Sequence, residues 1–337
     1  MRAVGYRQSL PIADAESLLD VELPEPQPGP RDLLVEVRAV SVNPVDTKIR
    51  TRTQPPPGDI KVLGFDAAGV VRAVGSGATL FAPGDEVWYA GSIARQGTNC
   101  ELHLVDERIA GRKPRSLDFA HAAALPLTTI TAWELLFDRL GVLPGKRPAG
   151  ESLLVIGAGG GVGSILTQLA RRLTALTVIG TASRNETADW VMTLGAHHVI
   201  DHSKPLSAEL ARIGIDRVSH VASLTQTDLH FSEIVESIAP QGKVGVIDDP
   251  KSFDFTAFKR KCVSVHWEYM FVRPVFDTLD VIAQHRLLND VADLVDDGIV
   301  RTTFGEHFGR IDAANLKRAH ALVESGRAKG KIVLEGF

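Results

Sequence analysis

The chain is poor in cysteine and in aromatic residues, carries little net charge and has no long apolar run. Its 337 residues include two cysteines, Cys100 and Cys262, a number that excludes a disulfide framework and is typical of a reducing cytoplasm. No apolar run approaches the roughly 18 residues of a membrane-spanning helix, and the N-terminal residues lack the basic-then-apolar pattern of a signal peptide. The net charge of −4 gives no general basic field for nucleic acid or an anionic membrane surface. We therefore expect a cytoplasmic globular protein with neither a nucleic-acid nor a membrane partner.

The chain is long enough for two domains, and the pattern of its apolar residues changes along it. Up to about residue 125, short runs alternate between apolar and polar residues, as half-buried strands do. From about residue 127, strand-like and helix-like segments alternate, which predicts a parallel sheet with right-handed crossovers. Strands are expected at 33–40, 69–75, 87–88, 153–156, 176–181, 198–200, 218–222, 243–247 and 331–334, and helices from about 162 and over 185–194, 275–297 and 312–325.

The most informative segment is a glycine-rich turn at 157–163, which lies between a strand-like and a helix-like run. Glycine has no Cβ, so the backbone can turn tightly and approach a pyrophosphate, which the N–H groups and dipole of the helix start would hold. The spacing Ala158-x-Gly160-x-x-Gly163 is a variant of the dinucleotide-binding fingerprint. The alternative is a glycine-rich turn that binds nothing. The predicted cofactor contacts in this turn are Gly160, Gly161, Val162 and Gly163.

The residues after the next strand indicate which nicotinamide cofactor is bound. NAD-binding units place an acidic residue about 20 positions after the glycine turn, on the ribose 2′-hydroxyl. This chain has Ser183 and Arg184 there instead. An acid would repel a 2′-phosphate, whereas a hydroxyl and a guanidinium would bind it, so we predict NADPH. Ser183 and Glu186 also fit a helix capping box, a role that can coexist with phosphate binding.

Several short sequence segments resemble segments of the medium-chain dehydrogenase/reductase superfamily. They occur in the same order as in that superfamily and extend over essentially the whole chain. The resemblance is to its quinone oxidoreductase branch, and is closest to zinc-type alcohol dehydrogenase-like proteins that lack zinc ligands. It implies an α/β protein with a GroES-like β-rich catalytic domain at 1–126 and 272–337 and a doubly wound Rossmann domain at 127–271. The segments are VNPVDTK (42–48), GFDAAGVV (64–71), AALPLTTITAWE (123–134), LGAHHVID (194–201) and GKIVL (330–334).

The departures from the zinc-containing members bear on the chemistry. Asn43 stands where those members have cysteine, Phe65-Asp66 replaces His-Glu, and Leu127 replaces a third ligand. Phe and Leu cannot bind a metal and Asn is a poor zinc ligand, so no metal is predicted. Without a Lewis acid, alcohol dehydrogenation is disfavoured. The resemblance then implies an NADPH-dependent quinone reductase; the alternatives are reduction of the C=C bond of α,β-unsaturated carbonyls, a zinc-type alcohol dehydrogenase, and a non-catalytic NADPH-binding protein.

The resemblance also implies roles for individual residues near the cofactor. Asn43, Asp46 and Thr131 are the catalytic candidates, although Asn43 also fits a turn before a proline and Asp46 a helix-start carboxylate. His202 matches a position where relatives contact the phosphate, and a surface histidine is the alternative. Trp88, Tyr89 and Trp267 fit either an aromatic acceptor pocket or a core. The further cofactor-binding candidates are Thr128, Ser183, Arg184, His202, Met270 and Phe271.

A homodimer is the last expectation drawn from the resemblance. Relatives commonly pair the last strand of each Rossmann sheet across a two-fold axis, and residues 262–267 alternate as a strand should. An unpaired edge would otherwise expose a row of backbone N–H and C=O groups. The alternative is an edge covered by a loop of the same chain.

Overall fold

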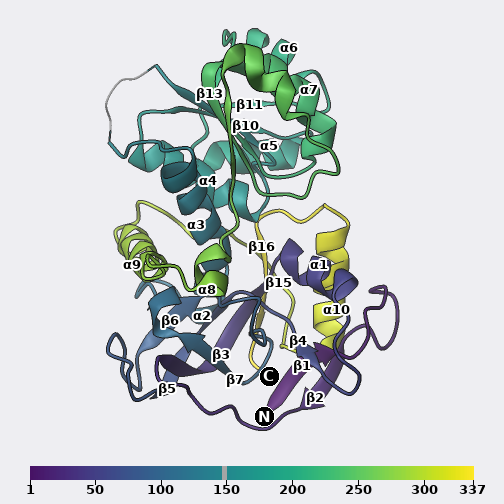
Figure 1. Cartoon of the computed structure of the whole chain (residues 1–337), viewed down its shortest axis with the longest axis vertical. Coiled ribbons are helices and arrows are strands. Elements are labelled where there is room, and N and C mark those ends of the chain that lie inside the picture. Colours follow the sequence, from purple (N-terminus) through teal and green to yellow (C-terminus); the bar gives the residue numbers. More distant parts are fainter. Residues whose placement is uncertain (146–149) are drawn as a thin grey trace. The chain divides into compact units, whose positions relative to one another are not determined.

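The computed structural model describes residues 1–145 and 150–337, and its contacts divide the chain into two compact units (Figure 1). Unit 1 comprises Met1–Ile130 and Phe271–Phe337, and unit 2 comprises Thr131–Met270. The first border expected from the sequence, 126/127, falls at the start of helix α3 (Pro126–Trp133), whereas the contacts divide this helix after Ile130.

Unit 2 is built on a six-stranded parallel sheet. Its elements are β9 (Ser152–Ile156), α4 (Gly161–Leu173), β10 (Thr177–Thr181), α5 (Asn185–Thr193), β11 (His198–Ile200), α6 (Leu206–Arg212), β12 (Val218–Ser223), α7 (Thr227–Ser237), β13 (Ile238–Val246) and β14 (Ser264–Trp267), with the π-helix η2 (Glu134–Arg139) and the 3-10 helix η3 (Phe255–Lys261). The strand order is β11-β10-β9-β12-β13-β14. The chain therefore starts in the middle, winds outward to β11 and returns to the other side of β9. The parallel strands are those predicted from the alternating pattern, and their order is the doubly wound one that the resemblance implies.

The central strand β9 shows why this sheet forms. All five of its residues are buried, because helices cover both faces of a parallel sheet and its strands read as continuous apolar runs. Helix α4 packs on β9 and β10, while α6 and α7 pack against each other. The core of the sheet gathers the side chains Leu154, Ile156, Ile179, Ile200, Val221, Val244, Val246 and Phe258.

Unit 1 is β-rich, as the first third of the sequence predicts. Its strands are β1 (Arg2–Tyr6), β2 (Leu19–Glu22), β3 (Asp32–Val42), β4 (Lys61–Val62), β5 (Ala67–Val74), β6 (Glu86–Tyr89), β7 (Leu102–Asp106), β8 (Ala110–Arg112), β15 (Phe304–His307) and β16 (Lys331–Glu335). Its helices are α1 (Pro44–Arg52), η1 (Glu107–Ile109), α2 (Phe119–Ala123), α8 (Val272–Phe276), α9 (Ala283–Asp296) and α10 (Ala313–Glu324). The larger sheet runs β15-β16-β3-β5-β6-β8 with β7 also paired to β3, and the smaller runs β2-β1-β4.

Two expectations about element boundaries are wrong. The helix expected over 275–297 is broken, because Asp277 adopts a left-handed conformation (φ 44°) that ends α8, and α9 starts only at Ala283. The strand expected over 262–267 begins at Ser264, because Cys262 is also left-handed (φ 51°) and ends η3.

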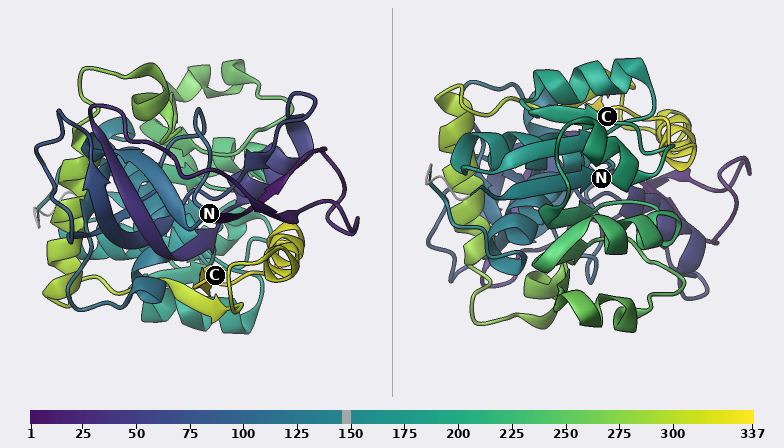
Figure 2. Two further views of the ribbon diagram at one scale, coloured as in Figure 1. Left: turned by 90° about the horizontal axis from the view of Figure 1, so that it is seen from below. Right: turned by 90° about the horizontal axis from the view of Figure 1, so that it is seen from above.

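The two ends of the chain meet within unit 1 (Figure 2). Strand β16 pairs antiparallel with β3, with Ile332 opposite Val42, and the Arg2 guanidinium lies 5.9 Å from the centre of the Phe337 ring. This register brings Lys331, at the start of β16, next to the end of β3. None of the helices in the described ranges is long and apolar enough to cross a membrane.

Candidate functional site

The glycine-rich turn joins β9 to α4 at the carboxyl edge of the parallel sheet. Gly160 is the N-cap of the 13-residue helix α4, and the first intrahelical bond runs from Ser164 N to Gly160 O (2.9 Å). The N–H groups of Gly161, Val162 and Gly163 precede that bond and mark the positive end of the helix dipole. The predicted pyrophosphate contacts therefore share one helix start, which is the arrangement that binds anions.

The space around these glycines separates a folding role from a binding role. A Cβ at Gly163 would lie 2.4 Å from the Gly157 oxygen and 2.5 Å from the Ala158 Cα, so this position must be glycine for the helix to pack on the strand. A Cβ at Gly160 would meet one atom, the Gly157 oxygen, at an ordinary 3.5 Å. The fold therefore tolerates a side chain at Gly160, and the space beside it is available for a ligand that approaches the backbone closely.

The residues predicted to contact the 2′-phosphate lie at or just after the ends of the neighbouring strands β10 and β11. Thr181 pairs with Ile200 across the two strands, and the Thr181 hydroxyl lies 3.0 Å from Nδ1 of His202. Ser183 and Arg184 follow β10 and are exposed, and the positive charge of Arg184 acts on His202. Burial lowers the pKa of His202, which leaves the imidazole neutral at pH 7.

The capping box expected for Ser183 is not formed. Helix α5 begins at Asn185 with Arg184 as its N-cap residue, and the Arg184 side chain makes no capping bond. The helix begins one residue later than the box requires, so the Ser183 hydroxyl is not committed to capping.

His230 is a residue of this region that the sequence analysis missed. It lies on the first turn of α7, is 5% exposed, and its ring centre is 5.9 Å from that of His202. Burial lowers its pKa, and the neighbouring His202 lowers it further. No local motif marks such a residue, because only the packing of α7 on the sheet brings it to the end of β11.

In unit 1, Asn43 and Asp66 belong to a buried polar cluster around the Lys331 ammonium. Lys331 is 3% exposed and donates to Asp66 Oδ2 (3.0 Å), to the Val42 carbonyl (3.2 Å) and to the Asn43 side-chain oxygen. The same Asp66 oxygen accepts from Ser41 (2.8 Å) and from Asn43 Nδ2 (2.7 Å). The ammonium thus gives all three of its protons to oxygen atoms, and the buried charges compensate each other.

This cluster joins the positions that the sequence resemblance matches to the ligand positions of zinc-containing members. The second oxygen of Asp66 accepts the Leu127 backbone N–H at 2.7 Å, and Asn43 Nδ2 lies 3.5 Å from the Phe65 carbonyl. Lys331 supplies a fixed positive charge against the Asp66 carboxylate there. Across the described residues, no group of three or more His, Cys, Asp and Glu side chains is placed to hold a metal ion.

Asp46 has the geometry of a helix-start carboxylate. It is 1% exposed, and its two oxygens accept the backbone N–H groups of Asn43 (2.7 Å) and Gly64 (2.9 Å). Burial raises the pKa of Asp46 to about 7, although both N–H donors and Lys331 act in the opposite direction. Asp46 therefore fastens the start of α1 to the segment before β5, and its catalytic role stays a prediction.

The remaining candidates lie on α3 and after β14. The Thr128 hydroxyl donates to the Leu125 carbonyl at 3.0 Å, and Thr131, one turn later, is 5% exposed. Met270 and Phe271 follow β14 and are each 3% exposed. Their predicted roles are compatible with this placement and remain predictions.

The aromatic candidates divide between core and surface. Trp88 and Tyr89 are fully buried in β6, and Tyr89 stacks on His103, which supports the core interpretation for both. Trp267 is 55% exposed at the end of the edge strand β14.

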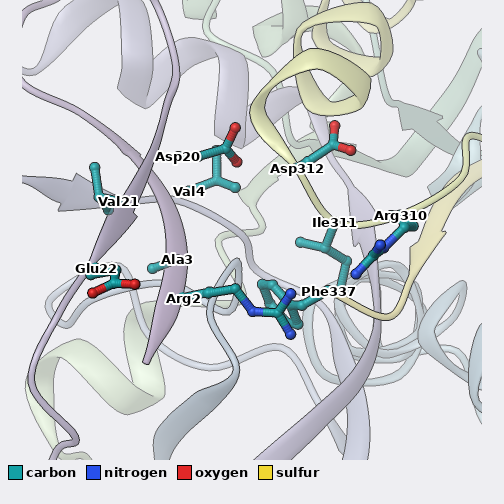
Figure 3. Close-up of a pocket in the computed structure, with 10 residues that line it drawn as sticks. All are labelled: Arg2, Ala3, Val4, Asp20, Val21, Glu22, Arg310, Ile311, Asp312 and Phe337. Atoms are coloured by element: carbon teal, nitrogen blue, oxygen red, sulfur yellow. The ribbon is translucent and has the colours of Figure 1, made fainter.

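A cavity of about 420 Å³ in unit 1 lies among β1, β2 and the start of α10 (Figure 3). The Arg2 and Arg310 side chains point toward Phe337 on its wall, but Arg2 is already ion-paired with Glu101 (2.6 Å). Asp20 and Asp312 accept backbone N–H groups at the start of α10. These charges are committed to the fold, so we do not assign a site to this cavity.

Comparison with known proteins agrees with this architecture. An alcohol dehydrogenase GroES-like domain matches residues 29–114, and a zinc-binding dehydrogenase domain matches residues 194–334. A zinc-type alcohol dehydrogenase-like protein of Staphylococcus aureus (strain MSSA476) is 38% identical over 99% of both chains. A structure from Rhizobium etli CFN 42, provisionally described as a zinc-dependent alcohol dehydrogenase, is 61% identical with a TM-score of 0.96 and covers 100% of this chain and 98% of that one. A quinone oxidoreductase structure from Pseudomonas syringae pv. Tomato DC3000 is 26% identical with a TM-score of 0.84 and 99% coverage of each chain.

The chain belongs to the medium-chain dehydrogenase/reductase superfamily. The predicted combination of a GroES-like domain with a Rossmann domain is confirmed. At the level of the superfamily, the protein is an NAD(P)-dependent oxidoreductase.

We expect Gly160→Val in this medium-chain dehydrogenase/reductase to abolish nicotinamide cofactor binding while leaving the thermal unfolding midpoint nearly unchanged. Its branched side chain would fill the space beside the helix start without meeting protein atoms closer than 3.5 Å at Cβ. Gly163→Val is the matched control, because its Cβ would collide with backbone at 2.4 Å and should destabilise the fold itself. Calorimetry and cofactor fluorescence measure the two effects. Normal affinity in Gly160→Val would mean that the turn serves only the fold.

Proposed function

We propose that the protein is a zinc-independent, NADPH-dependent oxidoreductase that reduces quinones by hydride transfer from the nicotinamide. The observation that carries the cofactor assignment is the pair Ser183 and Arg184 at the end of β10, where NAD-binding units have an acid. Both side chains are exposed, and the imidazole of His202 lies at the end of the neighbouring strand. A 2′-phosphate would find a cation and hydrogen-bond donors there and no carboxylate at the usual position.

The polar cluster around Lys331 supports a quinone as the hydride acceptor. Oxidation of an alcohol requires its hydroxyl proton to be removed, a step that zinc enzymes assist by binding the oxygen. Asn43, Phe65 and Leu127 supply no equivalent ligand set, and the Lys331 ammonium is fully engaged with Asp66, Asn43 and Val42. A quinone is already electrophilic and accepts hydride without such activation. The Pseudomonas syringae relative is a quinone oxidoreductase, which supports the same class.

The residues of this chain would bind and orient rather than react. The N–H groups at the start of α4 would hold the pyrophosphate, and Ser183, Arg184 and His202 the 2′-phosphate. Bound NADPH supplies the hydride. Thr131 and the backbone at Met270 would fix the nicotinamide, so that the hydride faces the acceptor at short range.

The same hydride geometry also suits the C=C bond of α,β-unsaturated carbonyls, which is the second candidate. A protein that binds NADPH without turnover is the third. A panel of quinones and enones, assayed by the loss of NADPH absorbance with and without a chelator, tests all three. We expect quinone-dependent oxidation that the chelator does not change. A preference for enones would support the second candidate, and the absence of any acceptor-dependent oxidation would support the third. One tightly bound zinc per chain would support a zinc-type alcohol dehydrogenase.

We expect Arg184→Ala to weaken NADPH binding by roughly 1.5–3 kcal/mol, the range for a hydrogen bond to a charged group, and to leave NADH binding unchanged. The guanidinium would contact the 2′-phosphate, which NADH lacks. Arg172→Ala removes the same charge from the far end of α4, where the side chain is exposed, and should leave both affinities unchanged. Equal losses for both cofactors in Arg184→Ala would refute the assignment. Fluorescence titration gives the affinities.

We also propose that the protein forms a homodimer through β14, the edge strand of the parallel sheet. Glu268 N donates to Val246 O of β13, so the N–H groups of Ser264 and His266 face the same way and that of Val265 faces the open edge. Trp267 and Tyr269 are 55% and 48% exposed beside this edge, an apolar surface that a second copy would cover.

Val265→Pro should dissociate this dimer without unfolding the chain, because proline removes an N–H that the sheet of its own chain does not use. His266→Pro is the contrasting variant, since its N–H faces β13 and its loss should destabilise the sheet. Light scattering at micromolar concentration measures the assembly. A wild-type mass equal to the 36.4 kDa of one chain would contradict the proposal.

A further inference from the structure

Two glutamates of unit 2 face each other in a buried position that the proposed chemistry does not use. Glu134 begins the π-helix η2 and is fully buried, and Glu268 follows β14 with a side chain that is 0% exposed. Glu134 Oε2 and Glu268 Oε1 are both buried and accept no hydrogen bond from a donor in the described residues, and each carboxyl group lies within hydrogen-bonding reach of the other. Two carboxylate oxygens cannot hydrogen-bond unless one of them carries a proton, so this geometry requires a proton between them.

The charges around the pair agree with a single proton. Arg139, at the end of η2, donates from Nε to Glu268 Oε2 at 2.9 Å. With one proton on the two carboxyl groups, one negative charge faces one guanidinium, and the buried group is neutral overall. With no proton, two buried carboxylates would share that one guanidinium. Burial, with Glu134 as the second cause, raises the pKa of Glu268 to about 9.

The other charged groups near the pair do not take over the role of this proton, which is to neutralise one of the two carboxyl groups. His266, on β14, has a pKa lowered by burial and by the positive charges of Lys243 and Arg139, so it stays neutral in alkaline solution. Lys243, on β13, donates to the Leu140 carbonyl at the end of η2 (2.7 Å), and Asp138 on η2 is exposed.

The pair joins the two segments expected to hold the nicotinamide half of the cofactor. Glu134 lies one helical turn after Thr131, on the same face of the helix. Glu268 lies two residues before Met270, and its own N–H is fixed to Val246 O at 3.0 Å. The helix is wound as a π-helix from Glu134 onward, a form that is frequently found at functional sites.

We propose that Glu134 and Glu268 share one proton and that this proton holds Thr131 and the Met270 backbone in the geometry that binds the nicotinamide. The two glutamates are positioning residues, and this role rests on the proposed function. When the proton is lost, like charges separate the end of β14 from η2 and the nicotinamide subsite loosens. The adenosine subsite, at the ends of β10 and β11, belongs to other strands and keeps its affinity.

The test compares NADPH with 2′,5′-ADP, which carries the adenosine 2′-phosphate but no nicotinamide. For the wild type we expect the NADPH dissociation constant to rise at least tenfold from pH 7 to pH 9.5 and that of 2′,5′-ADP to stay within about twofold. Glu268→Gln, whose amide can donate to Glu134 at any pH, should remove the NADPH dependence. Asp138→Asn, on the exposed side of the same π-helix, is the matched control and should behave as the wild type.

A parallel loss of NADPH affinity in Glu268→Gln and in the wild type would overturn the proposal, as would a wild-type affinity that does not change with pH. Infrared titration of the cofactor-free protein gives a second readout. Above pH 8, where Asp46 is ionised, it should show a protonated carboxyl band that disappears above about pH 9 and is absent in Glu268→Gln; a spectrum without that band would overturn the shared proton. A wild type that binds neither NADPH nor 2′,5′-ADP at pH 7 would overturn the proposed function and with it the positioning role, while the infrared titration still decides whether the pair holds a proton.

Discussion

The buried ion pair between Lys331 and Asp66 is the interaction on which the β-rich unit depends. It connects the last strand, β16, to the end of β3 and to the segment before β5, and the Asp66 carboxylate also fixes the backbone at Leu127. Four protein groups converge on the two oxygens of Asp66, so none of these charges faces an apolar environment alone. The positions that the sequence resemblance matches to metal ligands are thus held together by an internal cation.

A different constraint governs the parallel unit, namely the closeness of α4 to β9. Gly163 permits that approach, and the approach in turn aims the first N–H groups of the helix at the carboxyl edge of the sheet. The anion-binding end and the packing of the helix are therefore one feature. The exposed Ser183 and Arg184 extend the same edge toward β11, where two neutral histidines lie together.

Local sequence patterns were sufficient to predict the strands and helices of this unit. The features that were not predicted depend on contacts between residues far apart in the sequence. The glycine-rich turn at 157–163 is recognised from consecutive residues, so its strand–turn–helix context and the parallel sheet could be predicted, and the resemblance added the doubly wound order. Asp66 and Lys331 are separated by 265 positions, and nothing near either residue marks the other as its partner. His230 and the pair Glu134 and Glu268 escaped for the same reason. The errors at Asp277 and Ser183 have local causes. Asp277 is left-handed and interrupts the helix expected over 275–297, and the helix after Ser183 begins one residue later than a capping box requires.

The pairing of β16 with β3 also constrains how the chain can fold during synthesis. Unit 1 takes its strands from both ends of the sequence, while unit 2 is one continuous segment between them. Until the ribosome has released residue 331, Asp66 has no counter-ion, and β3 lacks its neighbour on that side. The Rossmann unit can complete its sheet first, whereas the GroES-like unit stays partly assembled until its last strand has been synthesised. Loss of a short C-terminal segment that includes β16 would therefore remove the counter-ion of Asp66 and the neighbour of β3. The damage would lie inside unit 1, although the first strands of this unit are synthesised much earlier.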